Sequence, residues 1–562
     1  MKTLRTILTG LSLSALGWAQ PDQGAVKAAI EEMYARVDAA MARHNAEDIG
    51  RMILPEAWLG VGPVHVSLLT WLDGAMKDPG RVSRSEVTGV LVSGANAIAS
   101  VRVHISSSSD RTKPEVLMSF RDTWVRRGDG WAWKEAVALS SHSQTPPTSA
   151  EAARPIVEEL RVRARKLATA EAGHGFEDMK AFGDAVGDTR IVALGEASHG
   201  TREFAQMKHR LLEFLVREKG FTVIAFEVDW PYCLAVDRYI KSGEGNLPRD
   251  LLPAFDEVRD MVEWMRAYNR DAAGGRLLTY TSFDMQAIPA PAEAVLAYLG
   301  RYFPEEVRGA EATYAGARKI GTDRSNVFLA GAGQAAGRAE ELLKRFDAHR
   351  TEWIKASSQD EWRDARQAAA VVAQACNMRV AANGLGYRDR MMARNVEWLA
   401  DEVHPHEKIV LWAHNGHVGF DPDNGRERKM GAWLRERFGK DLYVVGFAFR
   451  KGEVRAVGFE NGNNKGVGVW PVQASPEGSG DAILSAAGMP LFFLNIAGLP
   501  RGGALARWLA EPHLFHDLGG VVAIGDEDSG LDSGALTRDF DGLVFFEDTH
   551  AIHPLSTPAG RQ

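Results

Sequence analysis

Short, continuous apolar runs recur along the chain between about residues 190 and 547, and turn residues bound each of them. Such runs are typical of strands that are buried on both faces. Seven of them predict strands: RIVAL at 190–194, TVIAFE at 222–227, RLLTYTSFD at 276–284, KIVLWAH at 408–414, LYVVGFAF at 442–449, PLFFLNI at 490–496 and GLVFFE at 542–547.

Helical patterns separate several of these runs. In the stretch after residue 200, Thr201 is a suitable N-cap and Gly220 a suitable helix end. Between them, apolar residues recur at helical spacing: Phe204, Met207, Leu211 and Leu215. Strands that alternate with helices in this way predict an α/β fold over residues 156–562, with a mostly parallel sheet and helices on both faces. A helix-rich stretch at about 289–384 interrupts the alternation, and we expect it to form a helical insertion.

The first part of the chain follows another pattern. Apolar residues at helical spacing over 26–41 predict one helix, and strict alternation over 97–105 predicts a strand. Two aromatic-rich segments around Gly128-Asp129-Gly130 predict a hairpin. We expect a small α+β domain over 20–142, with a helix on a curved antiparallel sheet. The Ser-, Thr- and Pro-rich stretch that follows is assigned as a linker over 143–155.

The hairpin of this small domain carries DTWV at 122–125 and GW at 130–131. These motifs resemble the NTF2-like, SnoaL-like superfamily over residues of about 24 to 142. Members of that superfamily serve as enzymes or as binding and dimerisation modules, so the resemblance implies a possible homodimer through this domain.

Composition narrows the functional classes. A basic start, an apolar stretch at 7–16 and small residues before position 20 predict a signal peptide over 1–19, and therefore an exported, periplasmic or secreted protein. No other segment is long and apolar enough to predict a membrane span. The net charge of −8 argues against nucleic acid as a partner, because phosphate binding needs a basic surface. Cys233 and Cys376 could form at most one disulfide, and two buried thiols are the more typical arrangement.

Ionisable residues end four of the predicted strands. Each could be a helix cap or a turn residue by itself. However, the carboxyl ends of parallel strands meet at one edge of a sheet, where ligands bind in open α/β folds. The residues concerned are Glu196 and His199, Glu227, Asp284, and His414 with His417. The sequence therefore predicts one site at this edge.

The motifs around these residues resemble the erythromycin esterase family. GEASHGTREF at 195–204, IAFEVDW at 224–230, YRDRMMARNVEWL at 387–399, WAHNGHV at 412–418 and KMGAWLRERFG at 429–439 match in this order, and the resemblance spans about residues 156–555. It implies hydrolysis of a small-molecule ester, a macrolactone in the named members. It assigns catalysis to Glu196, His199, Glu227, His414 and His417, with His199 as the base that activates water. Lys208, Asp284 and Arg388 are the expected substrate-binding residues.

The resemblance has one departure, and the residues leave alternatives open. Macrolide esterases have an arginine where this chain has Lys208, and lysine lacks the planar, two-pronged donor geometry. No cofactor is expected, yet Glu196-x-x-His199 with His414-x-x-His417 could also bind a divalent metal. A third possibility is a non-catalytic protein that binds a small molecule on the same fold. No G-x-S-x-G motif occurs, which argues against a serine hydrolase.

Overall fold

A computed structural model describes residues 23–556 of the chain, apart from 62–63, 78–79, 94–95, 108–114, 244, 249–254, 273–274, 323–331, 382–383, 423–427, 461–462 and 525–529. The predicted signal peptide over 1–19 lies outside the described residues. Among the described residues, no helix is long and apolar enough to cross a membrane.

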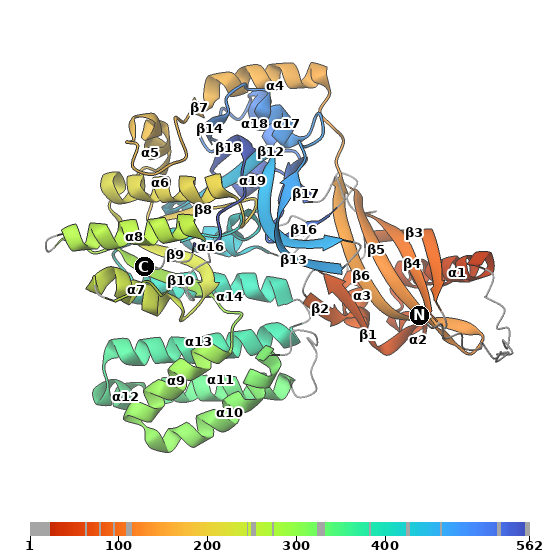
Figure 1. The fold of residues 1–562 in the computed structure, drawn as a ribbon, viewed down its shortest axis with the longest axis horizontal. Coiled ribbons are helices and arrows are strands. Elements are labelled where there is room, and N and C mark those ends of the chain that lie inside the picture. Colours follow the sequence, from red (N-terminus) through yellow and green to blue (C-terminus); the bar gives the residue numbers. More distant parts are fainter. Residues whose placement is uncertain are drawn as a thin grey trace, which may run out of the picture.

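The N-terminal part is a six-stranded sheet with three helices (Figure 1). Its elements are α1 (Gln23–Ala42), α2 (Ala46–Met52), β1 (Ile53–Val61), β2 (Val64–Ser67), α3 (Leu68–Met76), β3 (Arg81–Ser93), β4 (Asn96–Ser107), β5 (Glu115–Arg127) and β6 (Gly130–Gln144). The predicted helix, strand and hairpin are confirmed as α1, β4 and β5–β6. The expected antiparallel sheet is wrong at one pair, because β1 runs parallel to β6.

The linker after this sheet is shorter than predicted. Strand β6 continues to Gln144, and α4 (Ala150–Arg163) begins long before residue 155. Ser149 caps this helix by accepting a hydrogen bond from the Ala152 N–H at 3.3 Å. Pro155 lies inside this helix, at a position whose N–H would otherwise bond to the Glu151 carbonyl, so the proline removes one intrahelical hydrogen bond without ending the helix. Only 145–149 connect the two elements, and here the Thr145 hydroxyl donates to Ser533 Oγ at 3.0 Å.

A ten-stranded sheet forms the centre of the large domain. Along it lie β10 (Thr279–Asp284), β9 (Phe221–Asp229), β11 (Lys408–Trp412), β8 (Ile191–Leu194), β12 (Leu442–Glu460), β18 (Gly542–Thr549), β14 (Leu491–Asn495) and β7 (Arg165–Lys166). β13 (Asn463–Val472) and β16 (Val521–Ala523) also pair with β12. All seven predicted strands are present.

The expectation of a mostly parallel sheet needs correction, because the sheet is mixed. Six adjacent strands run parallel to one another: β10, β9, β11, β8, β12 and β18. β14 runs antiparallel to both β18 and β7, and β13 returns antiparallel along the extended half of β12. A continuous apolar run shows that a strand is buried, but it does not show the direction of its neighbour.

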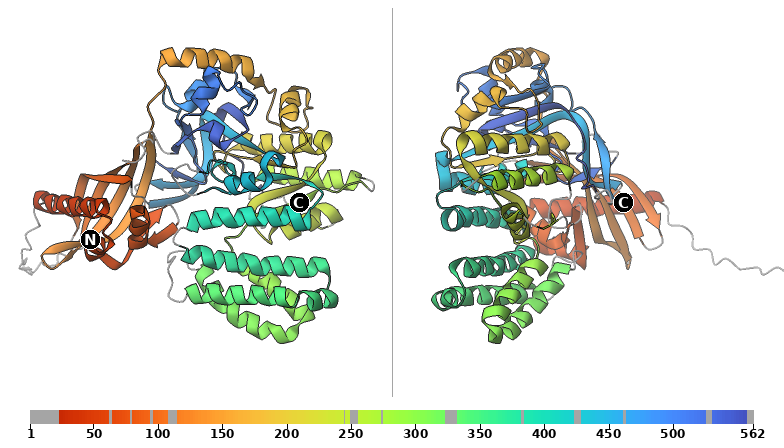
Figure 2. Two further views of the ribbon diagram at one scale, coloured as in Figure 1. Left: turned by 180° about the vertical axis from the view of Figure 1, so that it is seen from behind. Right: turned by 60° about the vertical axis from the view of Figure 1, so that its left-hand side comes forward.

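Helices cover both faces of this sheet (Figures 1 and 2). The side chains of β8 show the two faces: Ile191 and Ala193 belong to one apolar core, whereas Val192 and Leu194 belong to the other. The first core contains residues of α4, α14 (Gly384–Trp398), α16 (Met430–Phe438), α17 (Gly480–Ser485) and α18 (Ala504–Leu509). The second contains residues of α5 (Lys180–Val186), α6 (Arg202–Lys219), α7 (Cys233–Ser242) and α8 (Asp256–Asp271).

Five further helices follow β10, and their apolar residues belong to the second core; they are seen in green to teal in Figure 1. They are α9 (Pro289–Tyr302), α10 (Pro304–Thr322), α11 (Ala332–Ala348), α12 (Arg350–Ala356) and α13 (Gln359–Val380). They occupy the stretch for which a helical insertion was expected. Cys233 and Cys376 are both free and buried.

The remaining elements are short. They comprise η1 (Glu177–Met179), η3 (Leu399–Val403), α15 (Asn415–Val418), η4 (Gly439–Asp441), β15 (His513–His516), β17 (Leu531–Gly534) and α19 (Leu536–Asp539). β15 and β17 form a separate antiparallel pair. This pair carries the turn at 517–520, which reaches the site described below.

Candidate active site

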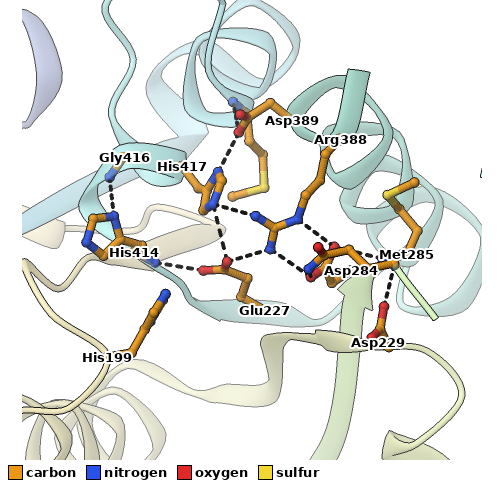
Figure 3. Close-up of polar contacts among 12 residues, drawn as sticks. His199, Glu227, Asp229, Asp284, Met285, Arg388, Asp389, His414, Gly416 and His417 are labelled. Atoms are coloured by element: carbon orange, nitrogen blue, oxygen red, sulfur yellow. Dashed lines mark hydrogen bonds and ion pairs between the residues drawn. The ribbon is translucent and has the colours of Figure 1, made fainter. Parts of the chain in front are cut away.

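The strand order brings the predicted site residues together. β10, β9, β11 and β8 are adjacent and parallel, so their carboxyl ends share one edge of the sheet. Glu227 and Asp284 lie at the ends of β9 and β10, and the loops after β8 and β11 supply the remaining residues. Figure 3 shows Glu227, Asp284, His414 and His417 converging around Arg388 from α14, with His199 beside them.

Glu196 and His199 form a pair at the end of β8. The Glu196 Oε1 atom lies 2.6 Å from His199 Nδ1, so the ring donates its Nδ1–H to the carboxylate. Lys208 Nζ donates to the other oxygen, Oε2, at 2.7 Å. The Glu196 side chain is 7% exposed and that of Lys208 is fully buried, whereas that of His199 is 42% exposed. The carboxylate is therefore fixed from behind, and the imidazole faces solvent.

Charge determines the protonation of this pair. Burial favours the neutral acid at Glu196, but the positive charge of Lys208 and the His199 hydrogen bond outweigh burial and lower the Glu196 pKa. The surrounding protein disfavours the imidazolium of His199, but the hydrogen bond that His199 donates to Glu196 and the charge of Glu227 raise the His199 pKa. Burial lowers the pKa of Lys208 to about 8, although Glu196 opposes this shift.

Arg388 is the centre of the other half of the site. Its Nη2 donates to Glu227 Oε1 at 2.6 Å and to Asp284 Oδ2 at 2.7 Å, and its Nε donates to Asp284 Oδ1 at 3.0 Å. Both carboxylates are almost completely buried. Burial opposes the ionised form of Glu227, but the charges of His417 and Arg388 hold the pKa of Glu227 well below its usual range. One guanidinium thus pairs with two buried acids from neighbouring strands, and His417 adds positive charge beside Glu227.

His417 has partners at both ring nitrogens. Nδ1 lies 2.8 Å from Asp389 Oδ1, while Nε2 lies 2.8 Å from Arg388 Nη1 and 3.2 Å from Glu227 Oε1. Burial disfavours the charged ring, but Glu227 and Asp389 raise the pKa of His417 to about 10. The Arg388 guanidinium can only donate hydrogen bonds. Its contact with His417 Nε2 therefore favours the neutral ring, in which Nε2 is an acceptor, and opposes the rise in the His417 pKa. In either protonation state, neither nitrogen is left for a substrate.

His414 accepts a hydrogen bond at one ring nitrogen, and its other nitrogen is buried beside a carboxylate. The Gly416 N–H donates to Nδ1 at 3.1 Å, and Nε2 lies 3.0 Å from Asp517 Oδ1. The backbone N–H of His414 donates to Glu227 Oε2 at 2.9 Å, which connects the loop to the Arg388 cluster. The centroids of the His414 and His199 rings are 5.1 Å apart.

Two residues of the site were missed. Asp389 follows Arg388 in the YRDRMMARN motif, and its place beside a motif arginine was a usable signal. Asp517 lies in a turn more than a hundred residues after His414, and nothing in the local sequence marks it.

The three residues expected to bind substrate have other partners. Lys208 is fully buried behind Glu196, so its expected contact with substrate is wrong. Asp284 is 3% exposed, and Arg388, Met285 and Gln286 all donate to it. The Arg388 side chain is 11% exposed, and it faces carboxylates and His417. Their charges are paired with other residues of the candidate site.

The alternative of a metal site does not fit these donors. Arg388 lies between Glu227 and His417 at hydrogen-bonding distance from both, and a guanidinium repels a cation. Within the ranges that the structure describes, no three His, Cys, Asp or Glu side chains are arranged to hold a metal ion.

Comparison with known proteins places this arrangement in a family. The family model described as "Erythromycin esterase" matches residues 216–549. The chain is 26% identical over 345 residues to "Putative hydrolase YbfO" of Bacillus subtilis (strain 168), covering 54% of this chain and 74% of that protein. It is 25% identical over 359 residues to "Erythromycin esterase type II" of Escherichia coli, covering 58% and 85%. A crystal structure of a Bacillus cereus protein superposes with a TM-score of 0.63 at 23% identity, covering 72% of this chain and 99% of that one.

Replacing Arg388 tests the charge balance of the site. In Arg388→Met, two buried carboxylates lose their counter-charge, and we expect the free energy of unfolding at pH 7 to fall by about 3–5 kcal/mol. His417 and Arg388 together hold the Glu227 pKa low, so the stabilisation that Arg388 contributes is present above the unfolded pKa of about 4.5 and is lost as the pH falls through the lower folded value. The difference in the free energy of unfolding between Arg388→Met and wild type should therefore become smaller at acidic pH. Urea unfolding at several pH values measures this difference.

Arg390→Met is the matched control, because Arg390 lies two positions away on α14 with an exposed side chain over the Trp433 ring. We expect it to cost no more than about 1 kcal/mol. Equal losses in the two variants at pH 7 would contradict the role of Arg388.

Proposed function

Because the chain belongs to the erythromycin esterase family, we propose that this ester hydrolase uses His199 as the general base for direct attack of water on an ester. The observation that carries this proposal is the difference between the three histidines. His417 has partners at both ring nitrogens, and the Nε2 of His414 is buried 3.0 Å from Asp517 Oδ1, whereas His199 uses only Nδ1. Its Nε2 makes no hydrogen bond within the described parts of the chain, and the ring is 42% exposed.

The chemistry follows from this geometry. With Nδ1–H bound to Glu196, the neutral ring has its lone pair on Nε2. Water attacks the carbonyl carbon of the ester while its proton moves to His199 Nε2. Glu196 stabilises the imidazolium that forms. When the acyl C–O bond breaks, the same proton passes to the leaving alkoxide, which yields an acid and an alcohol and restores the neutral ring.

Lys208 supports His199 indirectly. It keeps Glu196 ionised inside the protein, with the ammonium 2.7 Å from Oε2 and 4.5 Å from the centre of the Trp412 ring. Without this charge, a buried Glu196 would protonate more readily and would lose its hold on the imidazolium.

A macrolactone-like ester is the proposed substrate class. Its support is the family resemblance and the similarity to the erythromycin esterase of Escherichia coli. The lysine at 208, where macrolide esterases have an arginine, argues less strongly against macrolides than the sequence suggested. Lys208 is buried behind Glu196, so the exchange changes the support of Glu196 and not a surface that touches substrate.

Substitution of His199 tests both the activity and the base. The purified protein, incubated with a macrolide and with a simple aryl ester, should add one water to the substrate, as mass spectrometry can show. His199→Asn should lower kcat by about 100-fold or more, because it removes the proton acceptor. His174→Asn, at a histidine that is 57% exposed, is the control and should leave kcat unchanged.

Two results would argue against the proposal. Full turnover by His199→Asn would exclude this histidine as the base. Thermal stabilisation of the wild type by a macrolide without any turnover would favour a small-molecule-binding protein.

The pH profile gives an independent check. Only the neutral His199 ring accepts a proton, so kcat/KM should rise with pH through the His199 pKa, which lies above the usual value of about 6.5. Glu196→Gln removes the carboxylate that raises this pKa. The acid limb of its profile should move to lower pH, while its plateau should fall by at least about 10-fold. Glu171→Gln, at an exposed acid, should change neither feature. If the acid limb of the kcat/KM profile stayed at the same pH in Glu196→Gln, the pairing of Glu196 with His199 would be contradicted.

We also propose that the protein is exported, in support of which stand the basic start and the apolar run of residues 1–19. N-terminal sequencing of the mature chain should begin after Ala19, and an intact Met1 would refute this. Pairing of two copies through the N-terminal domain is proposed only from the NTF2-like motifs of its hairpin.

A further inference from the structure

A turn between β15 and β16 contacts two of the three histidines, and the reaction described above gives it no role. The His199 N–H donates to Gly519 O at 3.0 Å, and the Leu518 N–H donates to Ala197 O at 2.7 Å. On the other side, Asp517 Oδ1 lies 3.0 Å from His414 Nε2. The turn at 517–520 therefore connects the loop after β8 with the loop after β11.

The turn approaches both imidazole rings closely. Gly519 has φ +57, a conformation that favours glycine, and the Val521 N–H closes the turn on Leu518 O at 3.4 Å. A Cβ atom at Gly519 would lie 3.9 Å from His414 Nε2, and one at Gly520 would lie 3.6 Å from His199 Cδ2. Backbone atoms of the turn thus form one wall beside the two rings.

Three other parts of the fold hold this turn in place. The Asp517 N–H donates to Gly530 O at 2.6 Å, and the Val457 N–H of β12 donates to Gly520 O at 3.0 Å. Next to the turn, the buried His516 N–H donates to Asp481 Oδ2 of α17 at 2.8 Å. The position of the turn is therefore set by the fold.

Two neighbours favour one proton position on His414. Because the Gly416 N–H donates to Nδ1, this nitrogen holds a lone pair and the neutral ring carries its proton on Nε2. The Asp517 Oδ1 atom lies 3.0 Å from Nε2, within ion-pair distance although outside hydrogen-bond geometry, and its negative charge favours a proton there. In this state, His414 has no lone pair with which to accept a proton from water.

We propose that the turn Asp517–Gly520 is a positioning element for both histidines. Asp517 holds His414 as the Nε2–H tautomer and so keeps it from acting as a second base, while Gly519 O holds the backbone of His199 in place. This proposal rests on the proposed role of His199 as the catalytic base. It adds Asp517 as a positioning residue and Gly519 as the residue that fixes the catalytic loop.

Asp517→Asn tests the contact with His414. An asparagine amide can donate to Nε2, which would move the ring proton to Nδ1 and against the Gly416 N–H. We expect kcat to fall by about 10-fold or more with KM within about twofold, because misplaced groups slow the reaction more than they weaken binding. Asp517→Glu, which restores the charge, should recover part of kcat. Glu511→Gln, at an exposed acid in the same segment, is the control and should match wild type.

Imidazole 15N NMR separates positioning from a general loss of structure. With His414→Asn to assign the signal, His414 should appear as the Nε2–H tautomer in wild type and should lose this signature in Asp517→Asn. The signal of His199 should keep its own tautomer. A His414 tautomer that is the same in both proteins would overturn the role of Asp517.

Gly519→Ala tests the contact with His199, and Gly488→Ala is its matched control. Both glycines have positive φ, +57 and +75, and neither substitution meets an atom closer than 3.9 Å. Both variants should therefore lose similar thermal stability through backbone strain. Only Gly519→Ala should lose kcat, by about 10-fold. Equal kcat values in the two variants would overturn the role of Gly519.

The outcomes distinguish this inference from the proposed function. A wild-type protein that hydrolyses no ester would refute the proposed function, yet the His414 tautomer would still decide the role of Asp517. A wild-type hydrolase whose kcat and His414 signal are unchanged in Asp517→Asn would refute the inference alone.

Discussion

The geometry of the site depends on the pairing of two buried carboxylates with one arginine. Glu227 and Asp284 end neighbouring strands, and both are enclosed by protein. An uncompensated carboxylate at such a depth costs several kcal/mol. Arg388 removes this cost because its planar group donates to both acids, and a lysine could not reproduce this geometry. The contact also fixes α14 against the edge of the sheet on which the catalytic loops lie.

From this cluster, contacts extend to the rest of the site. Glu227 holds the loop after β11 through the His414 N–H, and His417 is fixed between Arg388 and Asp389. This half of the site has its polar groups paired within the protein. The other half, at the end of β8, has a buried carboxylate behind a solvent-exposed imidazole. The two halves of the site therefore differ in their chemistry. The paired groups around Arg388 give a rigid surface, whereas the unpaired ring nitrogen of His199 can accept a proton.

The β15–β17 pair joins this site to a distant part of the fold. It carries the turn beside His199 and His414, and Ser533 of β17 accepts a hydrogen bond from Thr145 at the end of the N-terminal sheet. Among the elements of the large domain, this pair therefore contacts both the N-terminal part and the catalytic loops. Residues of the N-terminal part and of the large domain, which the 145–149 connection joins, thus both contact the β15–β17 pair.

The sequence by itself determined the strands, the family and the edge of the sheet at which the site lies. Apolar runs predict buried strands because burial of both faces requires continuous apolar residues, and motifs such as GEASHG identify local chemistry that the order of residues preserves. Glu196, His199, Glu227, His414 and His417 were all found in this way. The mixed direction of the sheet and the short connection at 145–149 were not, because local patterns do not encode the direction of a neighbouring strand.

Only the tertiary structure decided which histidine is available as a base. The three histidines differ in their partners. His199 pairs with the nearby Glu196, which has Lys208 behind it, whereas the partners of His417 and His414 are remote in sequence: Asp389 with Arg388, and Asp517 from the turn after β15. The same is true of Lys208, Asp284 and Arg388, which were expected at the substrate and lie behind the catalytic residues. Burial and pairing set the charge and proton position of each group, and both depend on which segments the fold brings within about 3 Å of one another.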